Sequence, residues 1–264
     1  MQPEPPGSNL GGAGPAQPGR GWRRGLTLTA LVLGTAGLAA AAAGVSAQLL
    51  PRKFTAAQQQ QIMAWETARR WRTMPAGEIF PADVTYQLSG SALQSSTQLS
   101  LTAYRIGIAR QATCQAAADP AADAVLSADR CAALLRATYA DQTDSMLVTV
   151  GVAVMPDAAV AKSAAVRLTA GRQLLPGVKA IAFRNTLARG FGDRQRQLTW
   201  AISDGPYLIM SAAGYADGRP TEPVSSDPYA SQEMISLADG VAGAIGGPLG
   251  ASPPPPRCPG APGC

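Results

Sequence analysis

Histidine is absent from the 264-residue chain. Its absence excludes Ser-His-Asp and Cys-His nucleophilic catalysis, and it excludes zinc or haem sites that need an imidazole ligand. Lysine is scarce as well, because Lys53, Lys162 and Lys179 are the only ones, and none lies in an S-x-x-K pattern. The sequence therefore predicts a protein that is not an enzyme and that needs no cofactor or metal.

The chain also lacks a concentrated charge of either sign. Charged residues make up 15% of it, and the formal net charge is +5. The arginines beyond residue 50 are scattered along the chain, so no basic patch of the kind that binds nucleic acid is expected. Aromatic residues are few, at 5%, but the 46% hydrophobic content is enough for a folded core.

Charge is missing altogether from residues 26–50, a run of 25 residues that follows a Pro- and Gly-rich stretch at 1–25. As a helix this run would be about 37 Å long, more than the ~30 Å hydrocarbon core of a bilayer. Arg20, Arg23 and Arg24 precede it and favour a cytoplasmic N-terminus. We therefore expect a disordered cytoplasmic tail over 1–25, a transmembrane helix over 26–50 and an extracytoplasmic remainder. The predicted location is the cell membrane, with a single pass.

A cleaved signal peptide is the alternative interpretation of the same run. Val45, Ser46 and Ala47 resemble a small-residue cleavage site, and cleavage after Ala47 would give a secreted protein. The apolar run is longer than the usual h-region of about 7–15 residues, which favours a retained anchor. Both interpretations place the rest of the chain outside the cytoplasm.

The four cysteines all follow the apolar run, as expected for an oxidising compartment. We expect the two local pairings, Cys114 with Cys131 and Cys258 with Cys264. The first would close a loop onto a helix. The second lies in the Pro-rich stretch 249–264, which we expect to be a disordered tail, where it would link nothing obvious.

Residues 51–75 predict a membrane-proximal helix. Thr55 and Gln58 fit a capping box, while Ile62, Trp65 and Ala68 form an apolar stripe. This helix either packs on its own domain or lies on lipid headgroups, as a Trp- and Arg-containing helix near a bilayer can do.

Residues 76–248 predict a single extracytoplasmic α+β domain. Three successive strand-strand-helix units follow one another, with an additional strand at 177–185. Asp119-Pro120 and Asp227-Pro228 mark two helix starts, and hairpin turns are expected near residues 141–144 and at Asp204-Gly205. Hairpins joined to helices indicate an antiparallel sheet with helices packed on one face.

The stretch "GFGDRQRQLTW" at 190–200 contains the best candidate for a site. If residues 194–202 are extended, Arg194 and Arg196 share a face with Leu198 and Trp200 and lie at its rim. They would pair there with Asp193 or Asp217, or hold an anionic ligand. An ion pair within the chain is the simpler interpretation, since such pairs commonly have no ligand.

Other candidates are weaker. Asp141 and Asp144 are two acids in a tight turn, too few for a calcium loop. The glycines of "DGVAGAIGGPLG" follow no strand of a βαβ unit, so they do not indicate a nucleotide site.

Several segments resemble an uncharacterised family of actinobacterial single-pass envelope proteins with an extracytoplasmic α+β domain. They are "RRWRTMPAGEIFP", the two-cysteine segment, "FGDRQRQLTW" and "GPYLIMSAAGYADGRP", together with the apolar run. The resemblance covers most of residues 22–240. It implies a location and no activity.

The leading functional hypothesis is a non-enzymatic, membrane-anchored domain that binds an envelope protein or a small ligand. A carboxylate-based hydrolase of cell-wall polymers is the alternative, which requires Asp193, Asp217 or Glu222 in a shared cleft with a raised carboxyl pKa. A structural accessory subunit of an envelope complex is the third hypothesis, and it requires a large exposed apolar patch.

Overall fold

The computed structural model describes residues 35, 53–88, 99–169, 176–222 and 228–257, without the side chains of 228–230. The expected cytoplasmic tail, all of the 26–50 run except Thr35, the cleavage site after Ala47, and Cys258 and Cys264 lie outside these residues. In the part described, no helix combines the length and the apolar character needed to cross a membrane. The chain separates into two compact units, Thr55–Pro256 and Met1–Phe54 with Arg257–Cys264. The strands and helices with the bounds given below belong to the first.

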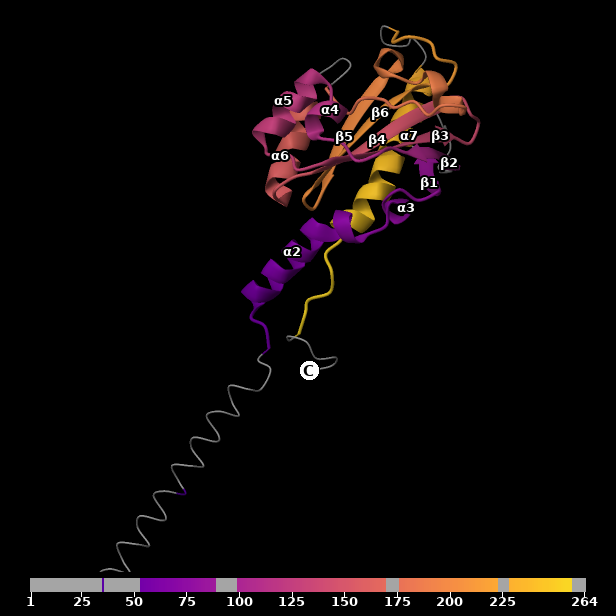
Figure 1. Ribbon diagram of the computed structural model, residues 1–264. Coiled ribbons are helices and arrows are strands. Elements are labelled where there is room, and N and C mark those ends of the chain that lie inside the picture. The colour runs from indigo at the N-terminus through magenta and orange to yellow at the C-terminus, as the bar shows by residue number, and fades with distance from the viewer. Residues whose placement is uncertain (1–34, 36–52, 89–98, 170–175, 223–227, 258–264) are drawn as a thin grey trace, which may run out of the picture. The chain divides into compact units, whose positions relative to one another are not determined.

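The centre of this unit is an antiparallel sheet of six strands, as far as the described residues go, in the order β1-β2-β3-β4-β6-β5 (Figure 1). Hairpins join β3 to β4 and β5 to β6 at the two turns that the sequence predicts. Gly205 in the second turn has φ +53°, a left-handed conformation that glycine adopts at little cost. The strands are β1 Asp83–Leu88, β2 Leu99–Ile108, β3 Leu134–Asp141, β4 Met146–Val154, β5 Leu198–Asp204 and β6 Tyr207–Tyr215.

The helices follow the strand pairs, so two strands and then one or two helices recur three times along the chain. After β4 the chain passes through a helix to β5 at the sheet edge, and β6 then returns between β4 and β5. The helices are α2 Ala56–Thr73, α3 Ala76–Ile79, α4 Cys114–Ala117, α5 Pro120–Ala128, α6 Ala158–Thr169 and α7 Pro228–Gly250.

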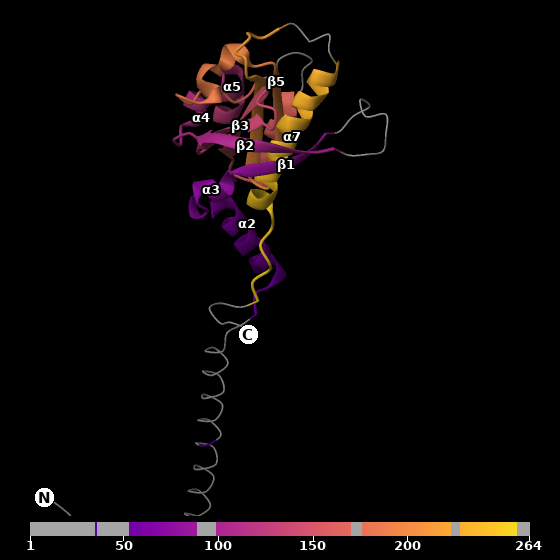
Figure 2. The same cartoon turned by 90° about the vertical axis from the view of Figure 1, so that its right-hand side faces the viewer.

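Helices cover both faces of the sheet, so the expectation of helices on one face is wrong. Figure 2 separates the two layers, with α7 on one side of the strands and α4 and α5 on the other. Leu237, Val241 and Ile245 of α7 pack with Val148, Val150 and Val152 of β4. Leu126 of α5 and Leu168 of α6 pack with Leu208 and Met210 of β6 on the opposite face. The domain is thus a three-layer arrangement within the α+β class.

Strand composition reflects this double cover. Every residue of β4, "MLVTVGVAV", is buried. Every residue of β6, "YLIMSAAGY", is buried except Tyr215, the last, which is partly buried. Such continuous apolar runs are typical of strands with both faces covered. The edge strand β1 alternates buried and exposed residues instead, because helices cover only one of its faces.

The segment 177–185 is not a strand. It forms only one isolated β-bridge, between Ala118 and Val178, as far as the described residues go. The segment lies over the sheet, where Val178 contacts Gly151. Side chains of the sheet satisfy its backbone: the hydroxyl of Thr138 donates to the Ile181 carbonyl at 3.0 Å, and the Ile181 N–H donates to Thr149 Oγ1 at 3.0 Å. The additional strand expected at 177–185 is therefore absent, and these hydroxyls take the place of a neighbouring strand.

Some of the glycines near the C-terminus serve close packing. Gly240 lies in α7 above Tyr86 of β1, where an added Cβ would come within 2.3 Å of the Tyr86 Cβ. Gly246 likewise lies close to Ile209 of β6, whereas Gly243 and Gly247 have open space where a Cβ would lie, so only some of these glycines reflect the close approach of α7 to the sheet.

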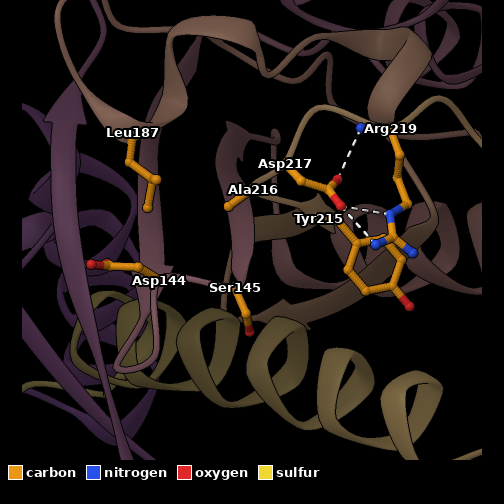
Figure 3. A pocket seen from close by; sticks show the side chains of 7 residues that line it. All are labelled: Asp144, Ser145, Leu187, Tyr215, Ala216, Asp217 and Arg219. Atoms are coloured by element: carbon orange, nitrogen blue, oxygen red, sulfur yellow. Dashed lines mark hydrogen bonds and ion pairs between the residues drawn. The ribbon is translucent and has the colours of Figure 1, made fainter.

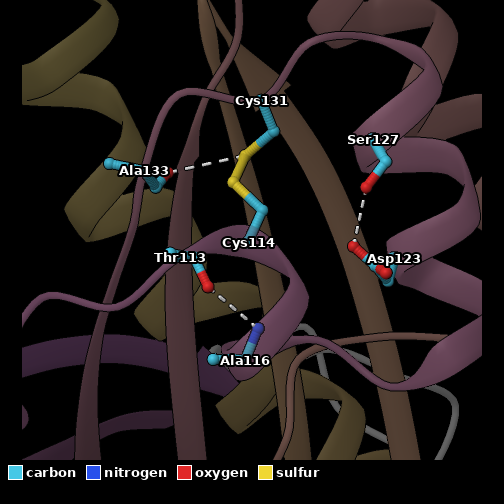
Figure 4. The surroundings of a disulfide bond; sticks show 7 residues. All are labelled: Thr113, Cys114, Ala116, Asp123, Ser127, Cys131 and Ala133. Atoms are coloured by element: carbon cyan, nitrogen blue, oxygen red, sulfur yellow. Dashed lines mark hydrogen bonds between the residues drawn. A yellow bond between two sulfur atoms is a disulfide. The ribbon is translucent and has the colours of Figure 1, made fainter.

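The disulfide between Cys114 and Cys131 is present (Figure 4), with the two Cα atoms 6.3 Å apart. It ties the start of α4 to the segment between α5 and β3. Thr113 caps α4 through the Ala116 N–H at 3.2 Å, and Asp119 caps α5 through the Ala122 N–H at 2.9 Å, with Pro120 in the first turn. The predicted Asp-Pro helix start and the local cysteine pairing are both confirmed here.

Candidate functional site

Arg196, one of the predicted site residues, is buried and points to carboxylates of its own chain. Its Nη1 lies 3.0 Å from Asp119 Oδ2 and 3.2 Å from the Val178 carbonyl. Its Nε lies 3.6 Å from Asp193 Oδ1. Asp119 also accepts the Gly177 N–H at 2.8 Å, so one ion pair holds the start of α5, the 177–180 segment and the approach to β5 together.

The extended face expected for residues 194–202 begins later than predicted. Asp193–Gln195 form a 3-10 turn, η2, and β5 begins only at Leu198. Leu198, Trp200 and Ile202 pack on the α7 side as expected. The prediction that Arg196 shares the face of Leu198 and Trp200 is wrong, because its guanidinium reaches Asp119 and Val178 on the opposite face.

Arg194 and Asp217 do not join Arg196. Arg194 is exposed and forms no ion pair with any residue in the described ranges. Asp217 pairs instead with Arg219, whose Nη2 lies 2.6 Å away. Of the four candidate residues, Arg196 and Asp193 join Asp119 in one ion-pair cluster, in which the Asp193 side chain is 43% exposed. Asp217 forms an exposed pair with Arg219, and Arg194 belongs to neither group.

The exposed pair lies in a surface depression of about 470 Å³ (Figure 3). Its walls come from the β3–β4 turn, from the end of β6 and from Leu187 of the 3-10 helix η1 (Leu187–Gly190). The lining residues are Asp144, Ser145, Leu187, Tyr215, Ala216, Asp217 and Arg219.

Arg219 is held in place from two sides. Its Nε and Nη2 donate to Asp217 Oδ2 at 2.8 and 2.6 Å, and its guanidinium carbon lies 4.4 Å from the centre of the Tyr215 ring. These hydrogen bonds lower the pKa of the Asp217 carboxyl, which stays ionised at neutral pH. The result is an aromatic ring, a cation and a carboxylate in fixed relative positions at the surface.

Across the depression lie Asp144 and Leu187 (Figure 3). Asp144 has φ +56°, and its carboxylate makes no hydrogen bond or ion pair with the described part of the chain. Leu187 is 38% exposed. The depression thus offers an apolar contact at Leu187 opposite the Asp217–Arg219 pair, and Asp144 lies at its border with its carboxylate directed away from that pair (Figure 3).

The neighbouring Asp141 has a structural role. It is buried, and its carboxylate accepts N–H groups from Thr143, Ser145 and Met146 at 3.1, 2.8 and 2.6 Å. These bonds fix the β3–β4 turn. In the described ranges no group of three or more Asp, Glu, Cys or His side chains is placed to hold a metal ion.

The carboxylates required by the hydrolase hypothesis do not share a cleft. Asp193 belongs to the Arg196 cluster, where its Oδ1 also accepts the Ala180 N–H at 3.0 Å. Asp217 lines the depression, whereas Asp193 and Glu222 do not. The pKa of the Asp217 carboxyl is lowered, which is opposite to the shift that a general acid needs.

Two residues of these sites, Asp119 and Leu187, were not predicted as site residues. The Asp-Pro signal identified Asp119 as a helix cap but not as the partner of Arg196, which is far away in sequence. Leu187 carried no signal at all, because its exposure depends on how η1 lies against the β3–β4 turn.

Tyr86 is buried beneath α7, and its hydroxyl has no hydrogen-bond partner among the described residues. Burial, with the charges of Asp141 and Glu233, raises the pKa of this phenol. Tyr86→Phe should therefore leave the free energy of unfolding unchanged or raise it by up to about 1 kcal/mol, because an unsatisfied polar group is removed. Urea unfolding checks this.

Tyr139→Phe is the matched control. The Tyr139 hydroxyl is also on a buried side chain but donates to the Pro81 carbonyl at 3.0 Å. Its loss should cost about 1 kcal/mol. Equal losses in the two variants would show that the Tyr86 hydroxyl is satisfied.

No protein-family model, no curated protein and no solved structure matches this chain.

Proposed function

We propose that the chain is a membrane-anchored protein of the cell exterior whose α+β domain binds another polypeptide, without catalysis, through the depression at the end of β6. The location rests on the 26–50 run and on the Cys114–Cys131 disulfide, which suits an oxidising compartment. The observation that carries the binding function is the fixed Tyr215–Arg219–Asp217 group facing Leu187 and Asp144.

A polypeptide fits this depression better than a small molecule does. Small-molecule sites usually bury most of their ligand, whereas the side chains of Arg219 and Asp217 are 44% and 50% exposed. Tyrosine and arginine are the residue types enriched where protein interfaces concentrate their binding energy. Arg219 already has its geometry set by Tyr215 and Asp217, so little side-chain entropy is lost when a partner docks.

The accessory-subunit hypothesis finds less support. The large exposed hydrophobic side chains in the described ranges are distributed over four elements, α2, β2, α6 and η1. They are Trp65, Leu99, Tyr104, Val166 and Leu187.

A photo-crosslinking amino acid that replaces Leu187 tests the proposal. The full chain is expressed in its native cells, so that the envelope contains its natural partners. We expect a specific crosslinked adduct of a polypeptide. In the same chain, Asp144→Asn with Arg219→Gln should lower the adduct yield about tenfold, since both charges contact the partner. The matched control carries the crosslinker at Val166, which is 62% exposed on α6, away from the depression.

No adduct at Leu187, or equal adducts at Leu187 and Val166, would overturn the proposal. Release of soluble fragments from purified cell wall by the intact protein would favour the hydrolase instead.

A further inference from the structure

Helix α2 has one face attached to the domain. Arg70 Nη1 donates to the carbonyls of Pro248, Leu249 and Ala251 at 2.6, 2.9 and 2.7 Å, which satisfies the C-terminal end of α7. The buried hydroxyl of Tyr207 donates to the Thr67 carbonyl at 2.6 Å and accepts the Trp71 N–H at 3.2 Å. These contacts fix which side of α2 faces the sheet and which side does not.

The opposite side of α2 is exposed and forms a continuous stripe, which we call the Trp65 face. It consists of Gln58, Gln61, Trp65, Arg69 and Arg72, whose spacing of three and four residues aligns them on one side of a helix. Trp65 is 58% exposed, and the Arg69 guanidinium carbon lies 4.5 Å from the centre of its ring. The capping box of Thr55 and Gln58 keeps the helix intact up to its first turn.

The chemistry of the Trp65 face matches a lipid headgroup layer. Tryptophan prefers the membrane–water interface, because its ring is apolar and its N–H is polar. Arginine can lay its apolar stem along the interface and hold its charge among anionic headgroups, where each basic residue contributes about 1 kcal/mol. The stripe contains two arginines and no acidic residue, since Glu66 lies about 100° around the helix from Trp65.

The length of the connecting chain keeps this face near the proposed anchor. Leu50 ends the apolar run and Ala56 begins α2. A fully extended chain of six residues spans at most about 20 Å, and an 18-residue helix is about 27 Å long. If residues 26–50 span the bilayer, α2 cannot leave the vicinity of its surface. Tethering therefore makes even a weak contact with the headgroups effective.

We propose that the Trp65 face docks on an anionic lipid surface and thereby sets how the domain is held above the membrane. The inference rests on the proposed membrane anchor. The occupant is the headgroup layer of the bilayer that holds the same chain.

The test uses the full chain reconstituted in vesicles of phosphatidylcholine with about 30% phosphatidylglycerol, and in vesicles of phosphatidylcholine alone. Tryptophan fluorescence is measured with and without lipids brominated near the top of the acyl chains. The difference in quenching between the unchanged chain and Trp65→Phe is the contribution of Trp65. The other tryptophans therefore need no substitution. We expect Trp65 to be quenched in the anionic vesicles and at least threefold less so with phosphatidylcholine alone.

Arg69→Gln with Arg72→Gln should reduce the Trp65 quenching to the level seen without anionic lipid. Arg184→Gln with Arg189→Gln is the control of equal charge change, because both of these arginines are exposed and far from α2 in sequence; it should leave quenching unchanged.

Flotation of the vesicles after carbonate washing distinguishes the two proposals. A chain that floats but shows no Trp65 quenching overturns the docking inference and leaves the anchor standing. A chain that does not float overturns the anchor itself, and docking with it. Trp65 fluorescence that changes with protein concentration and not with lipid charge indicates that a second copy of the chain covers Trp65. That result also overturns the inference.

Discussion

Replacing Arg196 with methionine should lower the free energy of unfolding by about 3–5 kcal/mol, the usual cost of removing one partner of a buried ion pair. Methionine fills much of the same volume, so the main loss is electrostatic. Asp119, whose side chain is only 13% exposed, would keep its charge without its closest cation. Urea unfolding with the disulfide intact is the measurement.

Arg194→Met supplies the control two residues away. Arg194 is exposed, so its replacement should change stability by no more than about 0.5 kcal/mol. In a double-mutant cycle, Arg196→Met with Asp119→Asn should cost less than the two single changes added together, by about 1–3 kcal/mol. Additive effects would mean that Arg196 stabilises the domain through packing alone. A loss of stability in Arg194→Met as large as that in Arg196→Met would contradict the exposure of Arg194.

Replacing both Cys114 and Cys131 with alanine should cost about 3 kcal/mol, because the disulfide closes a loop with a sequence separation of 17 and restricts the unfolded chain. For a domain of this size the melting temperature should fall by about 6–12 °C. Differential scanning calorimetry of the oxidised protein and of the double variant gives the difference.

The second cysteine pair provides the comparison. Cys258 and Cys264 lie in the Pro-rich C-terminal stretch. Replacing both with alanine should change the melting temperature of the domain by less than about 2 °C. Should the tail variant lose as much as the Cys114–Cys131 variant, the stabilising link would have to involve the C-terminal cysteines.

Local signals in the sequence located the turns, the caps and the strand pairs correctly. Gly205 in its turn, Asp119 before Pro120, and the Thr55 capping box all act within about four residues. Physical rules that depend only on neighbours in the chain suffice for such features.

Features that depend on distant residues were predicted less well. The apolar runs of β4 and β6 did carry the signal for helices on both faces, since a strand with one wet face alternates. No local pattern distinguishes the 177–185 segment from a strand, because its backbone partners are the hydroxyls of Thr138 and Thr149 on other strands. The partner of Arg196 was out of reach for the same reason.

The position of α7 has a consequence for the order in which the domain can form. Seven α7 residues belong to the larger core cluster: Met234, Leu237, Ala238, Val241, Ala242, Ile245 and Leu249. Strand β6, which lies between β4 and β5 in the sheet, is the last of the six strands in the chain. Until α7 has been synthesised or exported, one face of β1–β4 lacks these seven residues and has only the cover that Ile79 and Phe80, with Trp71 and Met74, provide. Only the hairpins and the Cys114–Cys131 loop are local enough to form earlier. Completion of this fold therefore waits for the last helix, and the nascent domain exposes its valine-rich face until that helix arrives.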